Sequence, residues 1–213
     1  RKIFDFALKE YLSERPIIFA LTVTTAPGGS IRTHGLFIGD TRRVLEEAVA
    51  LAQQKNMDYV ERGIKKCVVY LDPKEFRTTW LGNKSVYRTR MAIADGGELI
   101  VLAPGVHRFG EDDENDRLIR KYGYVGRENV LKLVEENDDL KANLSVAAHL
   151  IHGSSDGRFS ITYCTEKVGR EEVEGVCFGY IPYAEAAAQY DPAVLTDGWH
   201  TGADGKPFFY ISN

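Results

Sequence analysis

The sequence predicts an α/β fold: an open, mostly parallel sheet with helices on both faces, preceded by an N-terminal helix and a β-hairpin. Two apolar runs, Cys67–Leu71 and Glu98–Leu102, have the composition of strands that are buried on both faces of a sheet. Between and after these runs, apolar residues recur at helical spacing, as in crossover helices. Ahead of them, two β-branched stretches flank a Pro-Gly-Gly turn, a pattern typical of a hairpin.

The N-terminal residues account for the helix and the hairpin. Apolar residues recur at helical spacing over residues 3–12. The strands of the hairpin are expected at Ile17–Thr25 and Ile31–Ile38, with the Gly28-Gly29 pair in the turn between them.

Two parts of the chain are therefore expected. Residues 1–40 form a hinge or edge addition, and residues 41–213 form the α/β domain. Asp40 can cap a helix whose apolar residues recur over residues 44–52. Because a helical pattern is already under way at Arg1, we expect the chain to be part of a longer protein.

The α/β domain is predicted to alternate strands and helices. The two apolar runs are expected to be adjacent inner strands, joined by a helix around Lys84–Ala94. Thr196–Asn213 is rich in glycine and aromatic residues and is expected to be loop with at most one strand. The other elements are helices near Glu114–Tyr122, Arg127–Glu136 and Leu140–Ile151, strands at Arg158–Cys164 and Val176–Tyr180, and a helix at Tyr183–Tyr190.

The composition is that of a globular protein and excludes several classes of partner. The 213 residues are 44% hydrophobic and carry a net charge of −4, with both signs mixed along the chain. Because no basic arm or arginine cluster occurs, we expect no nucleic-acid partner. We expect no membrane partner either, since no apolar run could cross a bilayer and no signal-peptide pattern opens the sequence. Cys67, Cys164 and Cys177 are dispersed in apolar contexts, which predicts buried, reduced thiols and a cytoplasmic location.

Lys84 has the most specific chemical context in the chain. It lies in the segment Phe76–Arg88, which leaves the first apolar run and enters a helix, at the edge where open parallel sheets bind ligands. Trp80 is four residues earlier, so the two side chains can share one helix face. A partly buried lysine in a first helical turn favours the neutral amine, which suits a general base. The alternative is a lysine that extends to solvent beside a packing tryptophan.

A second polar pair is predicted at the same edge of the sheet. His107 and Arg108 lie in the loop Ala103–Gly110, directly after the second apolar run. Both side chains can donate hydrogen bonds to a carboxylate or a phosphate. The alternative is a surface loop with ordinary proline and glycine turn chemistry.

Other polar groups favour structural roles. His149 and His152 could share a metal, but their spacing indicates no third ligand, so capping of a helix C-terminus is the favoured role. The acidic run Glu111–Glu114 is expected to cap and solvate a helix start. No phosphate-cradling glycine loop, G-x-S-x-G, H-E-x-x-H or C-x-x-C motif occurs.

The chain resembles the C-terminal half of the nickel-pincer-cofactor lactate racemase family. The resemblance extends over roughly Ile17–Asp191, and its Ile31–Asp40 stretch is similar to the segment that leads into the family's second domain. It rests on four features in this order: Trp80, Lys84, the segment Gly96–Val101 and His107.

This resemblance implies an activity and site residues. The family transfers hydride between the substrate carbon and a nickel-bearing pyridinium cofactor, while a lysine and histidines handle the hydroxyl proton and the carboxylate. Lys84 matches the family's catalytic lysine, and Trp80 stands where the lactate enzymes have a tyrosine. The resemblance implies that Trp80, His107 and Arg108 bind the substrate, and that Arg108 stabilises the developing ketone.

The resemblance also implies what the chain lacks. The nickel ligands, the lysine that tethers the cofactor and an Asp-Thr-Arg motif belong to the family's N-terminal half, and this sequence has none of them. We therefore expect that the chain binds no cofactor itself, that the nickel pincer nucleotide belongs to the full-length enzyme, and that an N-terminal cofactor-binding domain of the same chain completes the active site. Polar residues at Leu140–Asn143, where lactate enzymes have an aromatic, favour a bulkier sugar acid.

The leading hypothesis is a substrate-facing domain of a racemase or epimerase of 2-hydroxy acids, of the lactate or aldonate type. One alternative is a non-catalytic domain that binds a sugar acid or carboxylate without turning it over. Another is part of a nicotinamide-dependent sugar-acid oxidoreductase, although the missing glycine fingerprint counts against it.

Overall fold

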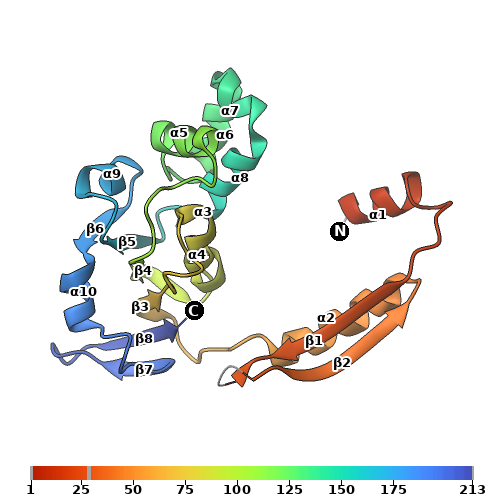
Figure 1. The fold of residues 1–213 in the computed structure, drawn as a ribbon, viewed down its shortest axis with the longest axis horizontal. Coiled ribbons are helices and arrows are strands. Elements are labelled where there is room, and N and C mark those ends of the chain that lie inside the picture. Colours follow the sequence, from red (N-terminus) through yellow and green to blue (C-terminus); the bar gives the residue numbers. More distant parts are fainter. Residues whose placement is uncertain (1, 28–29, 213) are drawn as a thin grey trace. The chain divides into compact units, whose positions relative to one another are not determined.

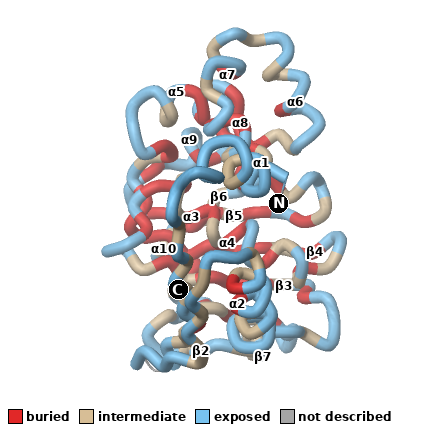
Figure 2. Tube along the Cα trace, turned by 90° about the vertical axis from the view of Figure 1, so that its right-hand side faces the viewer, coloured by how far each residue is buried: buried red, intermediate tan, exposed pale blue. Residues whose placement is uncertain are grey.

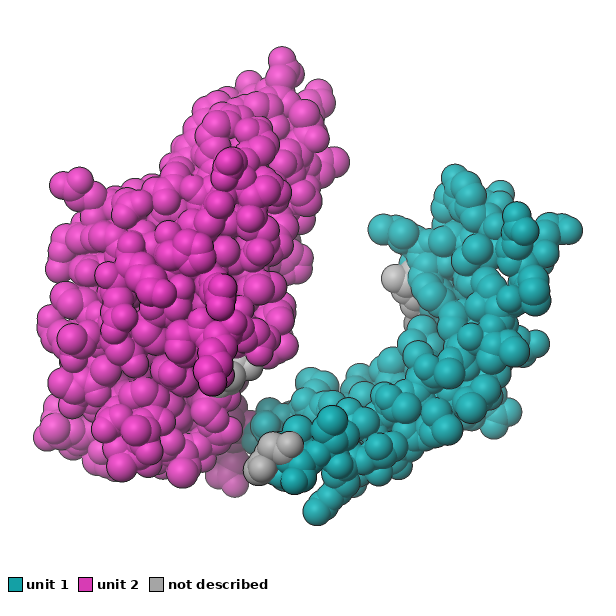
Figure 3. Space-filling model, in the orientation of Figure 1, with its two compact units in different colours: residues 1–59 teal, residues 60–213 magenta. Residues whose placement is uncertain are grey.

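The computed structural model describes residues 2–27 and 30–212, which form two compact units, residues 1–59 and 60–213 (Figure 3). We expected the division after residue 40, but helix α2 (Arg42–Lys55) belongs to the first unit. The reason is packing: the buried side chains of Val44 and Ala48 lie on the face of α2 that contacts the hairpin.

The first unit is a helix-covered hairpin. Strands β1 (Phe19–Thr25) and β2 (Arg32–Gly39) pair antiparallel, with a register shift between Val23 and Thr24. The turn expected at Gly28 and Gly29 lies outside the described residues. Helix α1 (Lys2–Glu10) precedes the hairpin and has no buried residue.

The second unit is built on a six-stranded sheet with the order β6-β5-β4-β3-β8-β7. All neighbouring pairs are parallel except β7 and β8 (Figure 1). The predicted pairing is confirmed, because the two apolar runs are the adjacent parallel inner strands β3 and β4. The strands are β3 (Ile64–Tyr70), β4 (Ile93–Leu102), β5 (Phe159–Thr165), β6 (Gly179–Pro182), β7 (Gly198–Thr201) and β8 (Pro207–Ser212).

Helices cover both faces of this sheet. The expected helix at Lys84–Ala94 ends at Thr89, and the one at Leu140–Ile151 is broken at Asn143, whose side chain caps the second piece. Asp112 caps α5, as predicted for the acidic run. The helices are α3 (Thr79–Gly82), α4 (Lys84–Thr89), α5 (Asp113–Tyr122), α6 (Arg127–Glu136), α7 (Asp138–Ala142), α8 (Leu144–His152), α9 (Arg170–Gly175) and α10 (Tyr183–Gln189).

Alternation along the inner strands divides the apolar residues between two cores. In β3, Cys67 and Val69 belong to the larger core under helices α4 to α9, whereas Val68 faces the smaller core under α10. In β4, Val101 belongs to the larger core and Ile100 to the smaller one. The buried residues accordingly follow the strands and the inner faces of the helices (Figure 2). This is why the inner strands are apolar on both faces.

The crossover geometry explains which helices lie on which face. Strands β3, β4, β5 and β6 follow one another across the sheet, and the chain then returns through α10 to the opposite edge. Because parallel crossovers are nearly always right-handed, connections that step in opposite directions cover opposite faces. Helix α10 therefore packs against the smaller core while α4 to α9 share the larger one.

Two expectations are corrected by the structure. Thr196–Asn213 contains two strands, and β8 lies inside the sheet beside β3, with Cys67 aligned to Phe209. Cys177 is exposed and adopts a left-handed backbone (φ 70°) after α9, although Cys67 and Cys164 are buried. None of the helices in the described ranges is both long and apolar enough to span a bilayer.

Candidate functional site

The loops that follow β3 and β4 pair with each other at the carboxyl edge of the sheet. The backbone N–H of His107 donates to the carbonyl of Arg77 (3.0 Å), and the N–H of Trp80 donates to the carbonyl of Phe109 (2.9 Å). A parallel bridge joins Thr78 to the same loop. All four residues predicted as site residues therefore lie on two short segments at one edge of the sheet, where parallel α/β sheets bind ligands.

Lys84 is the first residue of α4, and its ammonium lies against the loop that leaves β3. Its Nζ is 3.7 Å from Oε1 of Glu75 and 5.6 Å from the centre of the Phe76 ring. The Lys84 side chain is 27% exposed, so solvent and small molecules can reach it. A carboxylate and an aromatic face are both partners of a positive charge. Lys84 therefore lies at a partly exposed position of this edge.

Trp80 and Lys84 do not share their contacts. The two short helices α3 and α4 join at Asn83, which has helical backbone angles, so the chain turns almost continuously between them. The ring of Trp80 stacks on His149 of α8, with centroids 4.4 Å apart and planes at 24°. Lys84 instead reaches the loop of Glu75, so the tryptophan and the lysine present two different surfaces at this edge.

Arg108 is held by the acidic first turn of α5. Its Nη2 donates to Asp113 (3.0 Å), and its Nε lies 3.9 Å from Asp116. Asp116 also accepts hydrogen bonds from the backbone N–H groups of Phe109 (2.7 Å) and Gly110 (3.1 Å). Although burial opposes ionisation, hydrogen bonds from Arg120 and these two N–H groups lower the pKa of Asp116. The carboxylate thereby fixes the shape of the loop.

His107 lies next to Arg108 but its side chain is exposed. The structure therefore presents one exposed imidazole and one guanidinium that is paired with carboxylates. The ion pair to Asp113 is at the surface, and such pairs contribute little to stability. A bound carboxylate could replace Asp113 at modest energetic cost.

A buried polar network lies behind Trp80 and was not predicted. The hydroxyl of Tyr124 is 2.8 Å from Nε2 of His149 and 2.9 Å from Oγ1 of Thr79. The hydroxyl of Tyr163, on β5, donates to Oδ1 of Asn83 (2.7 Å). Buried tyrosine hydroxyls require such partners, which is the physical reason for the network.

The network keeps His149 neutral. Burial, followed by the charge of His152, lowers the pKa of His149 to about 4. Because Asn83 accepts from Tyr163 through its oxygen, its amide nitrogen faces Nε2 of His149 (3.5 Å). Because the hydroxyl of Thr79 donates to the carbonyl of Phe109 (3.0 Å), the hydroxyl of Tyr124 donates to Thr79 and accepts from Nε2 of His149, which assigns the ring proton to Nε2.

The expected role of His149 is therefore corrected. We expected His149 and His152 to cap the C-terminus of a helix as positive groups, and both do lie in the last turn of α8. His149, however, is neutral near pH 7 and supports the Trp80 ring. The sequence carried no signal for this contact, because Trp80, Tyr124 and His149 come from separate elements.

No metal site is found in the described residues. In residues 2–27 and 30–212, no three His, Cys, Asp or Glu side chains gather where they could hold a metal ion. Nε2 of His149 in particular is engaged by the hydroxyl of Tyr124 (2.8 Å).

Comparison with known proteins identifies the fold. No protein-family model and no curated protein sequence matches the chain. A protein from Thermotoga maritima solved by a structural genomics consortium is similar over the whole chain, with 23% identity and a TM-score of 0.73, and the chain spans 53% of its length. The lactate racemase apoprotein from Thermoanaerobacterium thermosaccharolyticum is similar over 80% of the chain, with 12% identity and a TM-score of 0.57. The chain has a lactate racemase-like fold.

The two known proteins are much longer than this chain. The chain spans about half the length of the Thermotoga protein and 40% of the lactate racemase apoprotein. The similarity in structure is thus a similarity to one part of those larger proteins.

Proposed function

We propose that this chain is the C-terminal, substrate-facing domain of a racemase or epimerase that acts on 2-hydroxy acids of the lactate or aldonate type. The observation that carries the proposal is the placement of Lys84 and Trp80 at the carboxyl edge of a lactate racemase-like sheet. The open position of Lys84 supports the idea that another part of the protein completes the site.

In this proposal Lys84 exchanges the proton of the substrate hydroxyl. The neutral amine takes that proton while the hydride of the carbon goes to the cofactor of the full-length protein, and the proton is returned when hydride and hydroxyl are restored. Glu75 lies 3.7 Å away and is placed to balance the charge of the protonated lysine. Trp80 offers an aromatic face to the carbon chain of the substrate, and its ring is held in position by His149.

Arg108 and His107 bind the substrate carboxylate in this proposal. The guanidinium already pairs with a carboxylate at the same site, in the form of Asp113, so its geometry suits that group. Exchange of Asp113 for the substrate carboxylate would keep Arg108 neutralised, and the other N–H groups of the guanidinium can donate to the substrate oxygen.

The nickel pincer nucleotide, proposed for the full-length protein, does not fit the residues of this chain. No convergent set of metal ligands occurs in the described part of the chain, and His149 is held by Tyr124 and Asn83. We therefore assign the cofactor to the proposed N-terminal domain and derive only the proton transfer and substrate binding from this chain.

The decisive experiment is a racemisation assay of the full-length protein with D-lactate and with an aldonate, comparing wild type with Lys84→Ala. Turnover should fall about 10²–10⁴-fold, the range for loss of a positioned acid–base group. The melting temperature should change little, because a lysine at an open edge contributes little to the core. Lys132→Ala, an exposed lysine of α6, is the control and should keep full turnover.

A second candidate is a binding domain without catalysis. The contact of Lys84 with Glu75 (3.7 Å) favours it, because it shows that a carboxylate can lie beside this ammonium. It predicts that Lys84→Ala weakens binding of the acid to the chain while wild type shows no racemisation. Undiminished turnover in Lys84→Ala, combined with a lower melting temperature, would exclude both functions for this residue.

A further inference from the structure

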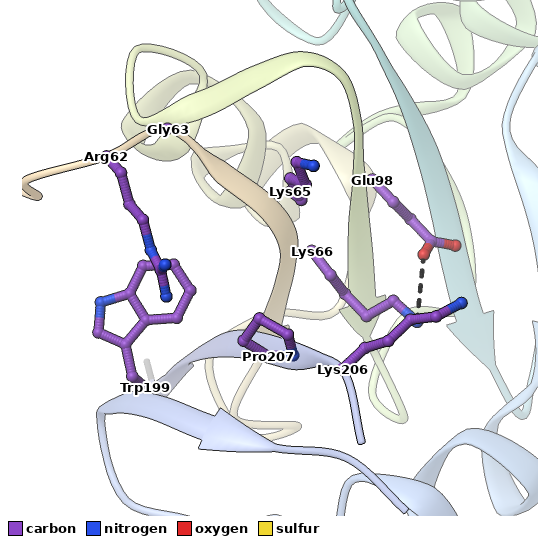
Figure 4. Close-up of a pocket in the computed structure, with 8 residues that line it drawn as sticks. All are labelled: Arg62, Gly63, Lys65, Lys66, Glu98, Trp199, Lys206 and Pro207. Carbon is purple, nitrogen blue, oxygen red and sulfur yellow. Dashed lines mark ion pairs between the residues drawn. The ribbon is translucent and has the colours of Figure 1, made fainter. Parts of the chain in front are cut away.

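A basic cavity lies at the amino edge of the sheet, opposite the candidate site. It has a volume of about 540 Å³ and is formed where β3 and β4 begin and the β7–β8 hairpin approaches them (Figure 4). This volume is within the range of small-molecule sites. The charged and aromatic residues that line it are Arg62, Lys65, Lys66, Glu98, Trp199 and Lys206.

The cavity carries an excess of positive charge. Four cationic side chains line it, and Glu98 is the one carboxylate among the lining residues. Glu98 pairs with Lys66 at 3.6 Å, and Asp204 adds a weaker attraction to Lys66 from outside the lining. Even with both carboxylates counted, two positive charges remain unbalanced. Like charges around one concavity repel each other, so an anion that neutralises them is stabilised.

Lys66 is fixed as the inner cation of the cavity. Its Nζ lies 3.4 Å from the hydroxyl of Tyr190 and 3.6 Å from Glu98, and its side chain is mostly buried. Tyr190 takes one of the three ammonium donors and Glu98 lies at ion-pair distance, so the ammonium can still donate to a ligand. An ammonium held in this way loses little side-chain entropy when it binds an anion.

Arg62 is fixed at the mouth of the cavity. Its guanidinium lies 4.9 Å above the ring of Trp199, and that ring makes an edge contact with Phe209 (5.4 Å). Figure 4 shows the guanidinium stacked over the indole. Stacking on an aromatic face leaves the planar N–H groups free to form hydrogen bonds at the edge. The Trp199 side chain is itself 42% exposed, so a ligand in the cavity lies beside it.

We propose that this cavity binds a phosphorylated small molecule that carries at least two negative charges, such as a molecule with a diphosphate group. Lysines act as point charges that suit phosphate oxygens, and the guanidinium of Arg62 can bind two of these oxygens at once. The surplus of positive charge matches a multivalent anion better than a monocarboxylate. The site is separate from the proposed racemase site and does not depend on it.

The test is calorimetric titration of the chain with pyrophosphate, ADP and citrate at low and at 0.5 M salt. Pyrophosphate and ADP should bind at low salt and weaken strongly at high salt, because the contacts are between charges. Citrate is a multivalent anion without phosphate and should bind at least tenfold more weakly. Equal affinity for citrate, or no binding of either phosphate compound at millimolar concentration, would overturn the proposal.

Variants locate the site. Lys206→Gln, at an exposed position, should weaken pyrophosphate binding at least tenfold without loss of folding. Lys66→Gln should do the same, but the change leaves Glu98 without its partner, so Lys206→Gln is the safer variant. Lys132→Gln lies on α6, away from the cavity, and should bind as wild type does. An equal loss in Lys132→Gln would show a general charge effect and would refute the site.

Fluorescence gives a second readout. The chain has two tryptophans, so a Trp80→Phe variant leaves Trp199 as the reporter beside the cavity. Pyrophosphate should change its emission with the affinity found by calorimetry, because the ligand displaces water next to Arg62 and the indole. Unchanged Trp199 emission at saturating pyrophosphate would place binding elsewhere and contradict the assignment.

Discussion

His149 illustrates how a single residue links the stability of the fold to pH. In the folded chain, burial beside Trp80 and Tyr124 lowers its pKa to about 4, whereas an unfolded histidine titrates near 6.5. Between these two values the unfolded chain binds more protons than the folded one. The contribution of His149 to the stability of the fold is therefore fully present above pH 6.5 and is lost as the pH falls toward 4.

The predicted variant is His149→Gln. Wild type should lose up to about 3 kcal/mol of unfolding free energy between pH 6.5 and pH 4 through this residue. The glutamine variant should lack this contribution, since glutamine does not titrate and its amide nitrogen can donate to the hydroxyl oxygen of Tyr124. Urea unfolding at several pH values measures the difference, with the exposed His107→Gln as the matched control. An identical pH dependence in His149→Gln and wild type would show that His149 is not the titrating group.

Sequence reasoning located the candidate residues but not their partners. Trp80, Lys84, His107 and Arg108 could be assigned to one edge because apolar runs mark where strands end, and parallel strands end together. Their partners, such as Glu75, Asp113 and His149, depend on how distant loops and helices pack. No local pattern encodes that packing, so these contacts required the structure.

At the scale of elements, α5 and the loop before it form one unit. The backbone of Gly110 approaches the first turn of α5 so closely that a Cβ would lie 2.2 Å from the backbone nitrogen of Asp116. Only glycine allows this approach, because the three nearest atoms, which belong to Asn115 and Asp116, are all backbone atoms and cannot rotate away. The close contact also positions the backbone N–H groups of Phe109 and Gly110, which donate hydrogen bonds to Asp116.

Gly110→Ala should therefore destabilise the chain by roughly 3 kcal/mol, at the upper end of the usual cost of overpacking. Thermal or urea unfolding measures the change. Gly175→Ala is the matched control, because a Cβ there meets nothing within 4 Å at the end of α9. It should be neutral or slightly stabilising. A Gly110→Ala protein as stable as Gly175→Ala would mean that α5 can move away without cost.

Sequence patterns missed β8 and the break at Asn143 for two different reasons. Pro207–Ser212 follows a polar, glycine-containing turn and begins with proline, features that are typical of a loop or an edge strand. The proline is tolerated because it is the first residue of β8, and the alternation of buried Phe208 and Tyr210 continues the sheet. The break at Asn143 was missed because the apolar spacing continues on both sides of it.

At the scale of the molecule, the two compact units predict a protease-sensitive connection. The segment between α2 and β3 contains Tyr59, whose side chain is 80% exposed, beside exposed Met57. Exposed segments between compact units are the preferred sites of proteolytic cleavage. Limited digestion with chymotrypsin should therefore release a resistant fragment that begins at Val60, as identified by mass spectrometry.

Tyr59→Ser should remove this cleavage and leave the rate of other cuts unchanged. If early cleavage instead occurs within residues 60–213, the second unit is not independently compact. The assignment of α2 to the first unit makes the same prediction, because a cut near residue 40 should be slow where α2 packs on the hairpin.

The position of β8 has a consequence for how the chain folds during synthesis. Until the ribosome has released Pro207–Ser212, β3 has an unpaired edge that exposes the backbone of Cys67 to Tyr70. Strands β3 to β6 can pair earlier, but the incomplete sheet presents an apolar edge to other nascent chains. The pairing of β3 with β8 spans most of the second unit, so its closure is slow relative to the local helices. We therefore expect the nascent chain to be most prone to aggregation in the interval before β8 emerges.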